Sequence, residues 1–331
     1  MIGRRDFITL FGGVAVAWPI AARAQQTGKL PTIGWLNSAR INEASMPAFN
    51  RGLADAGYVV GRNVNLEYRN TENDSDRLRT FAAEFVRQQV SVIVATTGTT
   101  AQAAKAATQT IPIVFDMGGD PVEEGLVASL NRPGGNATGV AIQAAEIAAK
   151  RLELLHELVP KAETIAALVR LEGPDVSDFG RAESKGFQSA ALAVGVRLLL
   201  VNAMTESAIA GDLANAVQQH AGALLVSGSQ AFAVARLPQI LSLANRYALP
   251  AMFFHSDAVP AGALASYGTD LSESFRQVGV YTGRILKGEK PADLPVVQST
   301  KFELVINLKT VKALGLNVSQ DMLSIADQVI E

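Results

Sequence analysis

The order of strand-like and helix-like segments occurs twice in this sequence, and this repetition limits the folds that the chain can adopt. From Thr32 the apolar runs TIGWL, NVNLEY, VSVIVA and IPIVF alternate with helical stretches, and from Thr164 the runs TIAAL, RLLLV, GALLVS and LPAMFF follow in the same order. Two longer pairs align closely: VRQQVSVIVATTG with VQQHAGALLVSG, and IPIVFDMGGDPVEEGLVAS with LPAMFFHSDAVPAGALAS. Chance similarity between apolar strands is the alternative explanation. The shared order over about a hundred residues favours an internal duplication.

Each half of the sequence has the pattern of an α/β fold. The runs VSVIVA and GALLVS are continuously apolar, as in parallel strands that helices cover on both faces. Strands that alternate with long helical stretches predict a doubly wound sheet. We therefore predict two doubly wound, Rossmann-like lobes joined by a hinge. Their ligand cleft is expected between the lobes, beyond the carboxyl ends of the strands.

The first residues, MIGRRDFITLFGGVAVAWPIAARAQQ, have the order of an export signal. Arg4 and Arg5 form a charged start, residues 7–20 are apolar but too short to span a bilayer, and residues 22–24 read Ala-Arg-Ala, which fits a cleavage site. We expect residues 1–24 to be a signal peptide of the twin-arginine type, whose removal leaves a periplasmic protein. A membrane anchor, a buried N-terminal helix and the general secretory route are the alternatives.

The composition excludes several kinds of partner and site. The chain has 29 basic and 31 acidic residues, so neither a nucleic acid nor an anionic membrane is expected as its main partner. It has no cysteine, which excludes disulfides and argues against a structural zinc site. After the leader, no apolar run reaches the roughly 18 residues of a transmembrane helix. We therefore expect an exported soluble protein with a core large enough for two lobes.

Known catalytic motifs are absent from the sequence. It has no GxSxG elbow, no Walker phosphate loop, no GxGxxG fingerprint and no HExxH pair, and its three histidines are far apart. We therefore predict a binding protein rather than an enzyme, with no cofactor and no metal. An enzyme that uses carboxylates of the cleft, with Asp116, Asp120 and Asp257 as candidates, is the alternative.

Short polar residues and glycines follow the predicted strands at the points where the chain enters a helix. Hydroxyls and free backbone N–H groups at such places can bind an anion, and carboxylates there can bind an ammonium group. A helix cap is the alternative for a single Ser or Thr, and a turn is the alternative for Asp116 and Asp120. The candidate ligand-binding residues are Asn37, Ser38, Thr97, Gly98, Thr99, Thr100, Asp116, Gly119, Asp120, Asp175, Ser177, Ser227, Ser229, Gln230, Asp257 and Tyr267.

These side chains together suit a zwitterion. The hydroxyls of the first half suit a carboxylate, and Asp175 and Asp257 of the second half suit an amine. Trp35, Phe232 and Tyr267 lie near predicted strand ends, where they can stack on an aromatic ligand or serve as core residues. An aromatic or branched amino acid is therefore the expected ligand. A small aromatic or aliphatic acid without an amino group is the alternative, which nearby carboxylates would disfavour.

Four long stretches resemble one known family. They are GYVVGRNVNLEYR, IPIVFDMGGDPVEEGLVASLNRPGGNATGV, AAKRLELLHELVP and GRILKGEKPADLPVVQSTKFELVINLKTVKALGL. They resemble ABC-transporter substrate-binding proteins of the tryptophan/tyrosine-binding type, and the resemblance covers nearly the whole chain. Two stretches depart from the family pattern. RLEGPDVSDFG replaces a loop that often begins with Asn-Pro, and Ser229-Gln230 stand where many relatives have an apolar or proline pair.

The resemblance implies a type I periplasmic binding protein fold, with two lobes, three crossover segments and closure on a ligand in the cleft. It implies an N-terminal lobe of residues 30–143 plus 268–293 and a C-terminal lobe of residues 144–267 plus 294–331. The family positions that line the cleft correspond here to Thr97, Gly98, Thr99, Thr100, Gly119, Asp120 and Pro121.

The resemblance also implies a function. Family members bind amino acids, notably aromatic ones, or other small organic acids. We therefore expect the solute-binding protein of an ABC importer, a monomer that works with an inner-membrane permease and its ATPase. A receptor that presents the same ligand to a sensor or chemotaxis system is the alternative.

Overall fold

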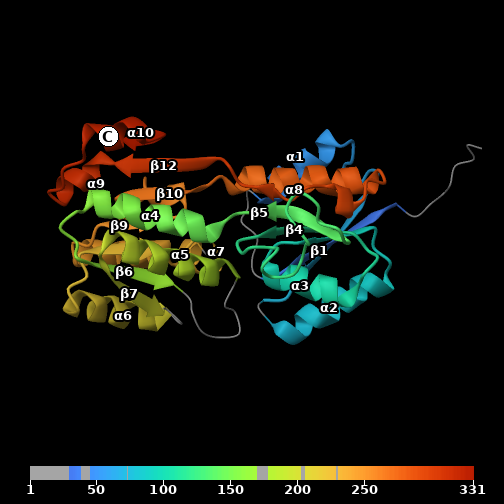
Figure 1. Cartoon of the computed structure of the whole chain (residues 1–331), viewed down its shortest axis with the longest axis horizontal. Helices are drawn as coiled ribbons and strands as arrows, with labels where there is room; N and C mark the ends of the chain where they lie inside the picture. Colours follow the sequence, from blue (N-terminus) through green and yellow to red (C-terminus); the bar gives the residue numbers. More distant parts are fainter. Residues whose placement is uncertain (1–29, 39–44, 73, 170–177, 203–205, 229) are drawn as a thin grey trace, which may run out of the picture. The chain divides into compact units, whose positions relative to one another are not determined.

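The computed structural model of the chain contains two β-sheets, each packed between helices (Figure 1). It describes residues 30–38, 45–72, 74–169, 178–202, 206–228 and 230–331. Pro31–Glu331 form one compact unit. The predicted α/β architecture with two sheet-centred lobes is confirmed.

The first sheet has six strands in the order β11-β5-β4-β3-β1-β2, and its neighbouring strands are all parallel. The strands β3, β4 and β5 are buried along their whole length. The continuously apolar sequence of β3 predicts this burial. The strands are β1 (Thr32–Asn37), β2 (Asn65–Asn70), β3 (Val92–Ala95), β4 (Ile113–Met117), β5 (Ala137–Ala141) and β11 (Val297–Gln298).

The second sheet has seven strands in the order β13-β12-β10-β9-β8-β6-β7. Its only antiparallel pair within the described residues is β10 with β12. The strands are β6 (Thr164–Val169), β7 (Arg197–Asn202), β8 (Ala223–Val226), β9 (Ala251–Phe253), β10 (Ala265–Thr269), β12 (Phe302–Asn307) and β13 (Gln328–Ile330).

Helices cover both faces of each sheet. In what we call the first lobe, α2 and α3 pack on one face of the first sheet and α1 and α8 on the other. In the second lobe, α4 and α5 pack on one face of the second sheet and α6 and α7 on the other. The helices are α1 (Ser45–Asp55), α2 (Ser75–Arg87), α3 (Gly98–Ala107), α4 (Ala144–Leu158), α5 (Asp178–Val194), α6 (Glu206–Gln218), α7 (Gln230–Arg246), α8 (Leu271–Leu286), α9 (Leu308–Ala313) and α10 (Gln320–Ile325), with short 3₁₀ turns η1 (Ser256–Ala258) and η2 (Pro291–Asp293). Among the described residues, none of the helices combines the length and the apolarity needed to cross a membrane.

The two sheets repeat one strand order, which confirms the predicted repetition of elements. Five strands of the first sheet lie in the order β5-β4-β3-β1-β2, and five of the second lie in the matching order β10-β9-β8-β6-β7. Gln89 and His220, which align in the two repeats, follow α2 and α6 and both have a left-handed backbone, with φ of 53° and 65°. His220 therefore belongs to the end of a helix.

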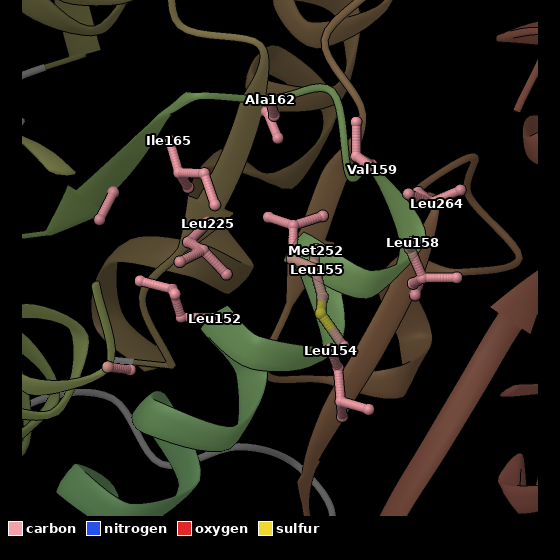
Figure 2. Close-up of a cluster of buried hydrophobic side chains, with 14 of the residues drawn as sticks. Leu152, Leu154, Leu155, Leu158, Val159, Ala162, Ile165, Leu225, Met252 and Leu264 are labelled. Carbon is pink, nitrogen blue, oxygen red and sulfur yellow. The ribbon is translucent and has the colours of Figure 1, made fainter. Parts of the chain in front are cut away.

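The helix α4 shows how the apolar pattern builds the core of the second lobe. Leu152 and Leu155 lie on the face of α4 that meets Ile165 and Leu225 of the sheet (Figure 2). All four side chains are fully buried. Residues three apart share one face of a helix, so the sequence alone predicts that these two leucines point to the same side. Burial of one such leucine stabilises the fold by roughly 1.5–3 kcal/mol.

The chain passes between the two sheets three times. β5 leads to α4, β10 leads back to α8, and β11 leads to β12, so α8 lies beside α1 in the first lobe (Figure 1). The expected lobe boundary after residue 293 differs from this arrangement, because β11 pairs with β5 in the first sheet. Leu294 and Val296 are buried in the cores of the first lobe. The strand β10 likewise continues to Thr269, past the expected boundary at residue 267.

Candidate functional site

A cavity of about 360 Å³ lies where the chain after β4 meets the first turns of α4 and α5. Pockets that bind small molecules have volumes of about 300–1,000 Å³. Both lobes line the cavity, and the predicted residues Gly119 and Asp120 are among its walls. The lining includes Gly118, Gly119, Asp120, Pro121, Glu123 and Glu124 of the first lobe, and Ala145, Glu146, Asp178, Arg181, Ala182 and Lys185 of the second.

Asp178, the first residue of α5, joins the two lobes at this cavity. Its Oδ2 accepts hydrogen bonds from the backbone N–H groups of Gly118 at 3.0 Å and Gly119 at 3.2 Å. The Asp178 side chain is buried, and its Oδ1 has no hydrogen-bond partner among the described residues. The backbone N–H groups that follow β4 are therefore occupied by a carboxylate of the other lobe.

Glycines allow this close approach. A Cβ atom on Gly118 would overlap the ring of Phe179 and lie 2.8 Å from the Phe179 Cα. A Cβ on Gly98 would lie 2.8 Å from Cγ of Asp178 and 2.9 Å from Oε2 of Glu124. Cβ atoms essentially never come within 3.0 Å of another heavy atom. A side chain at Gly118 would therefore push the lobes apart, and one at Gly98 would displace the side chains of Asp178 and Glu124.

The threonine-rich turn after β3 starts the helix α3. Thr97 is the N-cap, and its Oγ1 accepts a hydrogen bond from the backbone N–H of Thr100 at 3.2 Å. Thr100 completes the capping box, because its Oγ1 accepts from the backbone N–H of Thr97 at 3.0 Å. Thr97 and Thr100 thus have the capping role that we gave as their alternative. Thr99 is half-buried, 3.0 Å from Thr97 between hydroxyl oxygens, and lies outside the capping box.

Asn37 ties together the ends of neighbouring strands in the first sheet. Its Oδ1 accepts a hydrogen bond from the Thr96 hydroxyl at 2.6 Å, and its Nδ2 donates to the Tyr68 hydroxyl at 3.4 Å. The side chain is buried, and the adjacent Ser38 is half-buried. Neither residue lines the cavity described above.

Asp116, at the carboxyl end of β4, is a buried acid that is held by a hydroxyl group. Its Oδ1 accepts a hydrogen bond from Ser274 of α8 at 2.7 Å. Burial raises the pKa of Asp116 to about 7, and the nearby Asp178 adds to this rise while the Ser274 hydrogen bond opposes it. Near neutral pH this carboxyl group therefore exchanges between its protonated and ionised forms.

A buried ion pair supports the second-lobe side of the site. Arg151 of α4 donates from Nη1 to Oε1 of Glu183 at 2.8 Å and from Nη2 to the carbonyl of Val226 at 2.5 Å. Glu183 also accepts from the Ser227 hydroxyl and from the Gly228 N–H at 2.9 Å. Burial raises the pKa of Glu183, and these donors oppose that rise. The predicted residue Ser227 is thus held by a network that fixes the chain after β8.

Three residues that we considered from the sequence lie away from the cavity, and so does His255. Trp35 is fully buried in the core, where it meets the ring of Phe49 edge-on. Tyr267 is half-buried and stacks on Phe302, with ring centroids 5.9 Å apart. Asp257 is exposed on η1, and His255 lies within hydrogen-bond distance of the Gly228 carbonyl at 3.1 Å. As ligand contacts, Asp257 and Tyr267 stay predictions.

Several predicted positions fall where the structure gives no placement. Asp175, Ser177 and Ser229 lie outside the described residues, and only the backbone of Gln230 is described, as the start of α7. Within the part of the chain that is described, no group of three or more His, Cys, Asp or Glu side chains could hold a metal ion.

The structure adds residues that the sequence did not single out. Asp178 and Glu124 line the cavity, Phe179 lies against Gly118, and Arg151 and Glu183 form a buried ion pair in the second lobe. Asp178 has the sequence signature of a residue at a helix start, and that signature does not predict a contact with the other lobe. The glycine pair 118–119 was the one signal in the sequence that pointed to a close approach here.

The arrangement can hold a small polar molecule between the lobes. Carboxylates, cationic side chains and apolar residues surround the cavity, and two lobes that meet around a ligand can close on it.

Comparison with known proteins agrees with this architecture. A curated tyrosine-binding protein of Clostridioides difficile (strain R20291) is 29% identical over 275 residues, which cover 81% of this chain and 75% of that protein. A solved ABC domain in complex with L-Trp from Streptococcus pneumoniae has a TM-score of 0.79 at 26% identity, over 91% of this chain and 100% of that one. A ligand-free, open substrate binding protein with adhesive properties from Clostridium difficile has a TM-score of 0.66 at 25% identity, over 91% of this chain and 99% of that one.

The solved relatives bear out the fold expected from the resemblance, that of a type I periplasmic binding protein. A family model described as ABC transporter substrate binding protein matches residues 42–330, which is most of the chain. Proteins of this kind bind small solutes and work with a permease and its ATPase. This chain therefore belongs to the ABC transporter substrate binding protein family.

Proposed function

We propose that this protein binds an aromatic amino acid in the cavity between its lobes and delivers it to an ABC importer. The observation that carries the proposal is the 360 Å³ cavity between the lobes, whose walls combine carboxylates, cationic side chains and apolar residues. Two relatives support the choice of ligand, because one is named tyrosine-binding and the other was solved with L-Trp.

The ligand carboxylate is assigned to the start of α3, whose first residue, Gly98, lies against the cavity-lining side chains of Asp178 and Glu124. Its first turn carries the positive end of the helix dipole, and the Thr99 hydroxyl is beside it and outside the capping box. The Thr99→Val change keeps the shape of the side chain and removes the hydroxyl donor. It should weaken binding of any ligand carboxylate by about 1–2 kcal/mol. Thr80→Val on the exposed face of α2 is the matched control and should leave affinity unchanged.

A thermal-shift screen of amino acids and aromatic acids tests the ligand class. L-tryptophan or L-tyrosine at 100 times its dissociation constant should raise the free energy of unfolding by about 2.7 kcal/mol. Aliphatic amino acids of similar charge should give smaller shifts, because they fill less of the cavity. No shift with any aromatic amino acid, together with a shift for an acid that lacks the amino group, would refute the proposed ligand.

Export and partners complete the proposed role. We propose that residues 1–24 are removed on export and that the mature protein acts in the periplasm as a monomer beside its permease. N-terminal sequencing of exported protein should begin at Gln25. Recovery of the intact N-terminus in a membrane fraction would contradict cleavage. Light scattering of the purified protein tests the monomer.

A further inference from the structure

We propose that Asp178 and Glu124 form the subsite for the ligand's primary ammonium group, and that this subsite makes the protein select amino acids over the corresponding acids. The proposal rests on the proposed function, because it assigns one end of an amino-acid ligand. It names residues that differ from Asp175 and Asp257, the pair expected from the sequence.

Asp178 has one carboxylate oxygen satisfied and one that lacks a partner. Oδ2 receives the N–H groups of Gly118 and Gly119, whereas Oδ1 has no hydrogen-bond partner among the described residues although the side chain is 3% exposed. A buried, unpaired carboxylate oxygen is costly, and such atoms in native proteins commonly face a ligand or an ion. Asp178 also lines the cavity. This oxygen lacks a hydrogen-bond donor, and a cationic donor would also offset the negative charge of the carboxylate.

Glu124 brings a second carboxylate from the other lobe to the same place. Its Oε2 and Cγ of Asp178 both lie against Gly98, 2.9 Å and 2.8 Å from where a Cβ would stand. Burial raises the pKa of Glu124, and the charge of Asp178 raises it further, while Arg181 opposes this with a smaller effect. The two carboxylates therefore repel each other, and a positive charge between them would relieve the repulsion.

Two cationic side chains, Lys185 and Arg181, also line the cavity. Lys185 of α5 is exposed and pairs with Glu123 at 3.3 Å, away from the Asp178 carboxylate. The charge of Arg181 lowers the pKa of Glu124, but by less than burial and the charge of Asp178 raise it. Because Asp178 also occupies the N–H groups of Gly118 and Gly119, a ligand carboxylate cannot bind there. The ligand is thereby oriented, with its ammonium group at Asp178 and Glu124 and its carboxylate at α3.

Isothermal titration calorimetry with two matched pairs of probes tests the subsite. Each pair is an amino acid and its analogue without the amino group: L-tryptophan with 3-indolepropionate, and L-tyrosine with 3-(4-hydroxyphenyl)propionate. The wild type should bind each amino acid at least tenfold more tightly than its analogue. In Asp178→Asn the amino acids should bind about 10- to 100-fold more weakly, and the analogues as tightly as before or more so.

The variants are chosen so that folding does not decide the result. In Asp178→Asn the amide oxygen can still accept hydrogen bonds from the N–H groups of Gly118 and Gly119. Glu124→Gln is a change in the other lobe and should show the same selective loss of affinity for amino acids. Asp321→Asn is the matched control on the exposed first turn of α10 in the second lobe and should change neither affinity. An equal loss for amino acids and analogues in Asp178→Asn would make Asp178 only a contact between lobes and would overturn the subsite.

The same titrations separate the subsite from the proposed function. A wild-type protein that binds amino acids and analogues equally well would overturn the subsite and leave the aromatic solute in place. A wild-type protein that binds none of the four probes would overturn the proposed function and, with it, the assignment of its ammonium group.

Discussion

Arg151 donates a hydrogen bond to Glu183 across 2.8 Å, and both side chains of this ion pair are excluded from solvent. The guanidinium also lies over the rings of Phe187 and Phe254, at 5.1 Å and 5.8 Å from their centroids. The pair links α4 and α5 to the chain after β8. It therefore holds the second-lobe wall of the cavity in one position.

Removing one member of this pair should destabilise the protein strongly. Arg151→Met or Glu183→Met leaves a buried charge without its partner, which costs about 3–5 kcal/mol. The double variant should lose much less than the sum of the two losses, because no charge is then left unpaired. Urea unfolding of the three variants measures this coupling, and additive losses would contradict it.

The surface pair Lys185–Glu123 is the control for this experiment. Lys185 is on α5 like Glu183, but the two side chains of the pair are 72% and 68% exposed. Lys185→Met should change the free energy of unfolding by about 1 kcal/mol or less.

Asp116→Asn should change how stability depends on pH. The folded protein holds the pKa of Asp116 at about 7, above its unfolded value of 3.8, so this group favours folding most below pH 3.8 and loses that contribution as the pH rises to about 7. The ionised form then costs on the order of 4 kcal/mol, because each pKa unit corresponds to about 1.4 kcal/mol. The amide that replaces the carboxyl group accepts the Ser274 hydrogen bond without ionising. The variant should gain stability over the wild type between pH 5 and pH 8, and a constant difference in urea midpoint across this range would contradict this.

Gly118→Ala should impair closure of the lobes. The new Cβ would overlap Phe179, which the lobes can relieve only by staying further apart. Affinity for the solute should fall at least tenfold, and the ligand should no longer reduce the radius of gyration in small-angle X-ray scattering. Gly135→Ala is the control in the same lobe, because its Cβ would meet nothing within 4 Å. Normal closure of Gly118→Ala would refute the role of this contact.

Gly52→Ala should destabilise the packing of α1 on α8. Its Cβ would overlap the carbonyl oxygen of Arg276 and lie 2.9 Å from the backbone nitrogen of Val280. Overpacking of this kind costs about 1–3 kcal/mol. Gly211→Ala in the exposed part of α6 has no neighbour within 4 Å and should instead stabilise by about 0.5–1 kcal/mol. Thermal unfolding compares the two, and equal effects would contradict the packing explanation.

Most of the fold could be predicted because the central strands of both sheets are buried on both faces. VSVIVA and GALLVS became the central strands β3 and β8, and the aligned ends Gln89 and His220 show the same backbone conformation in both repeats. The strand β11 could not be predicted in this way. It is two residues long, and its place in the first sheet depends on β5 beside it rather than on a pattern of its own.

The candidate site was only partly predictable, because it is made by contacts between lobes. Gly119 and Asp120 line the cavity as the sequence led us to expect, and as ligand contacts they remain predictions. Asp178 was missed because a residue at a helix start shows no sign in the sequence of a partner sixty positions away. Arg151 and Glu183 were missed because charged residues on a helix are usually on its solvent face.

The first lobe is completed only after most of the second lobe has been synthesised. Trp35 of β1 stacks on Phe275 of α8 at 6.1 Å between ring centroids, and β11 adds the last strand of the first sheet. Ribosomes add about 5–20 residues each second, so the stretch from β5 to β11 takes on the order of ten seconds to appear. During that time the apolar face of β1 and α1 has no α8 to cover it. A chaperone that binds exposed apolar chain should therefore associate longest with the first half of this protein.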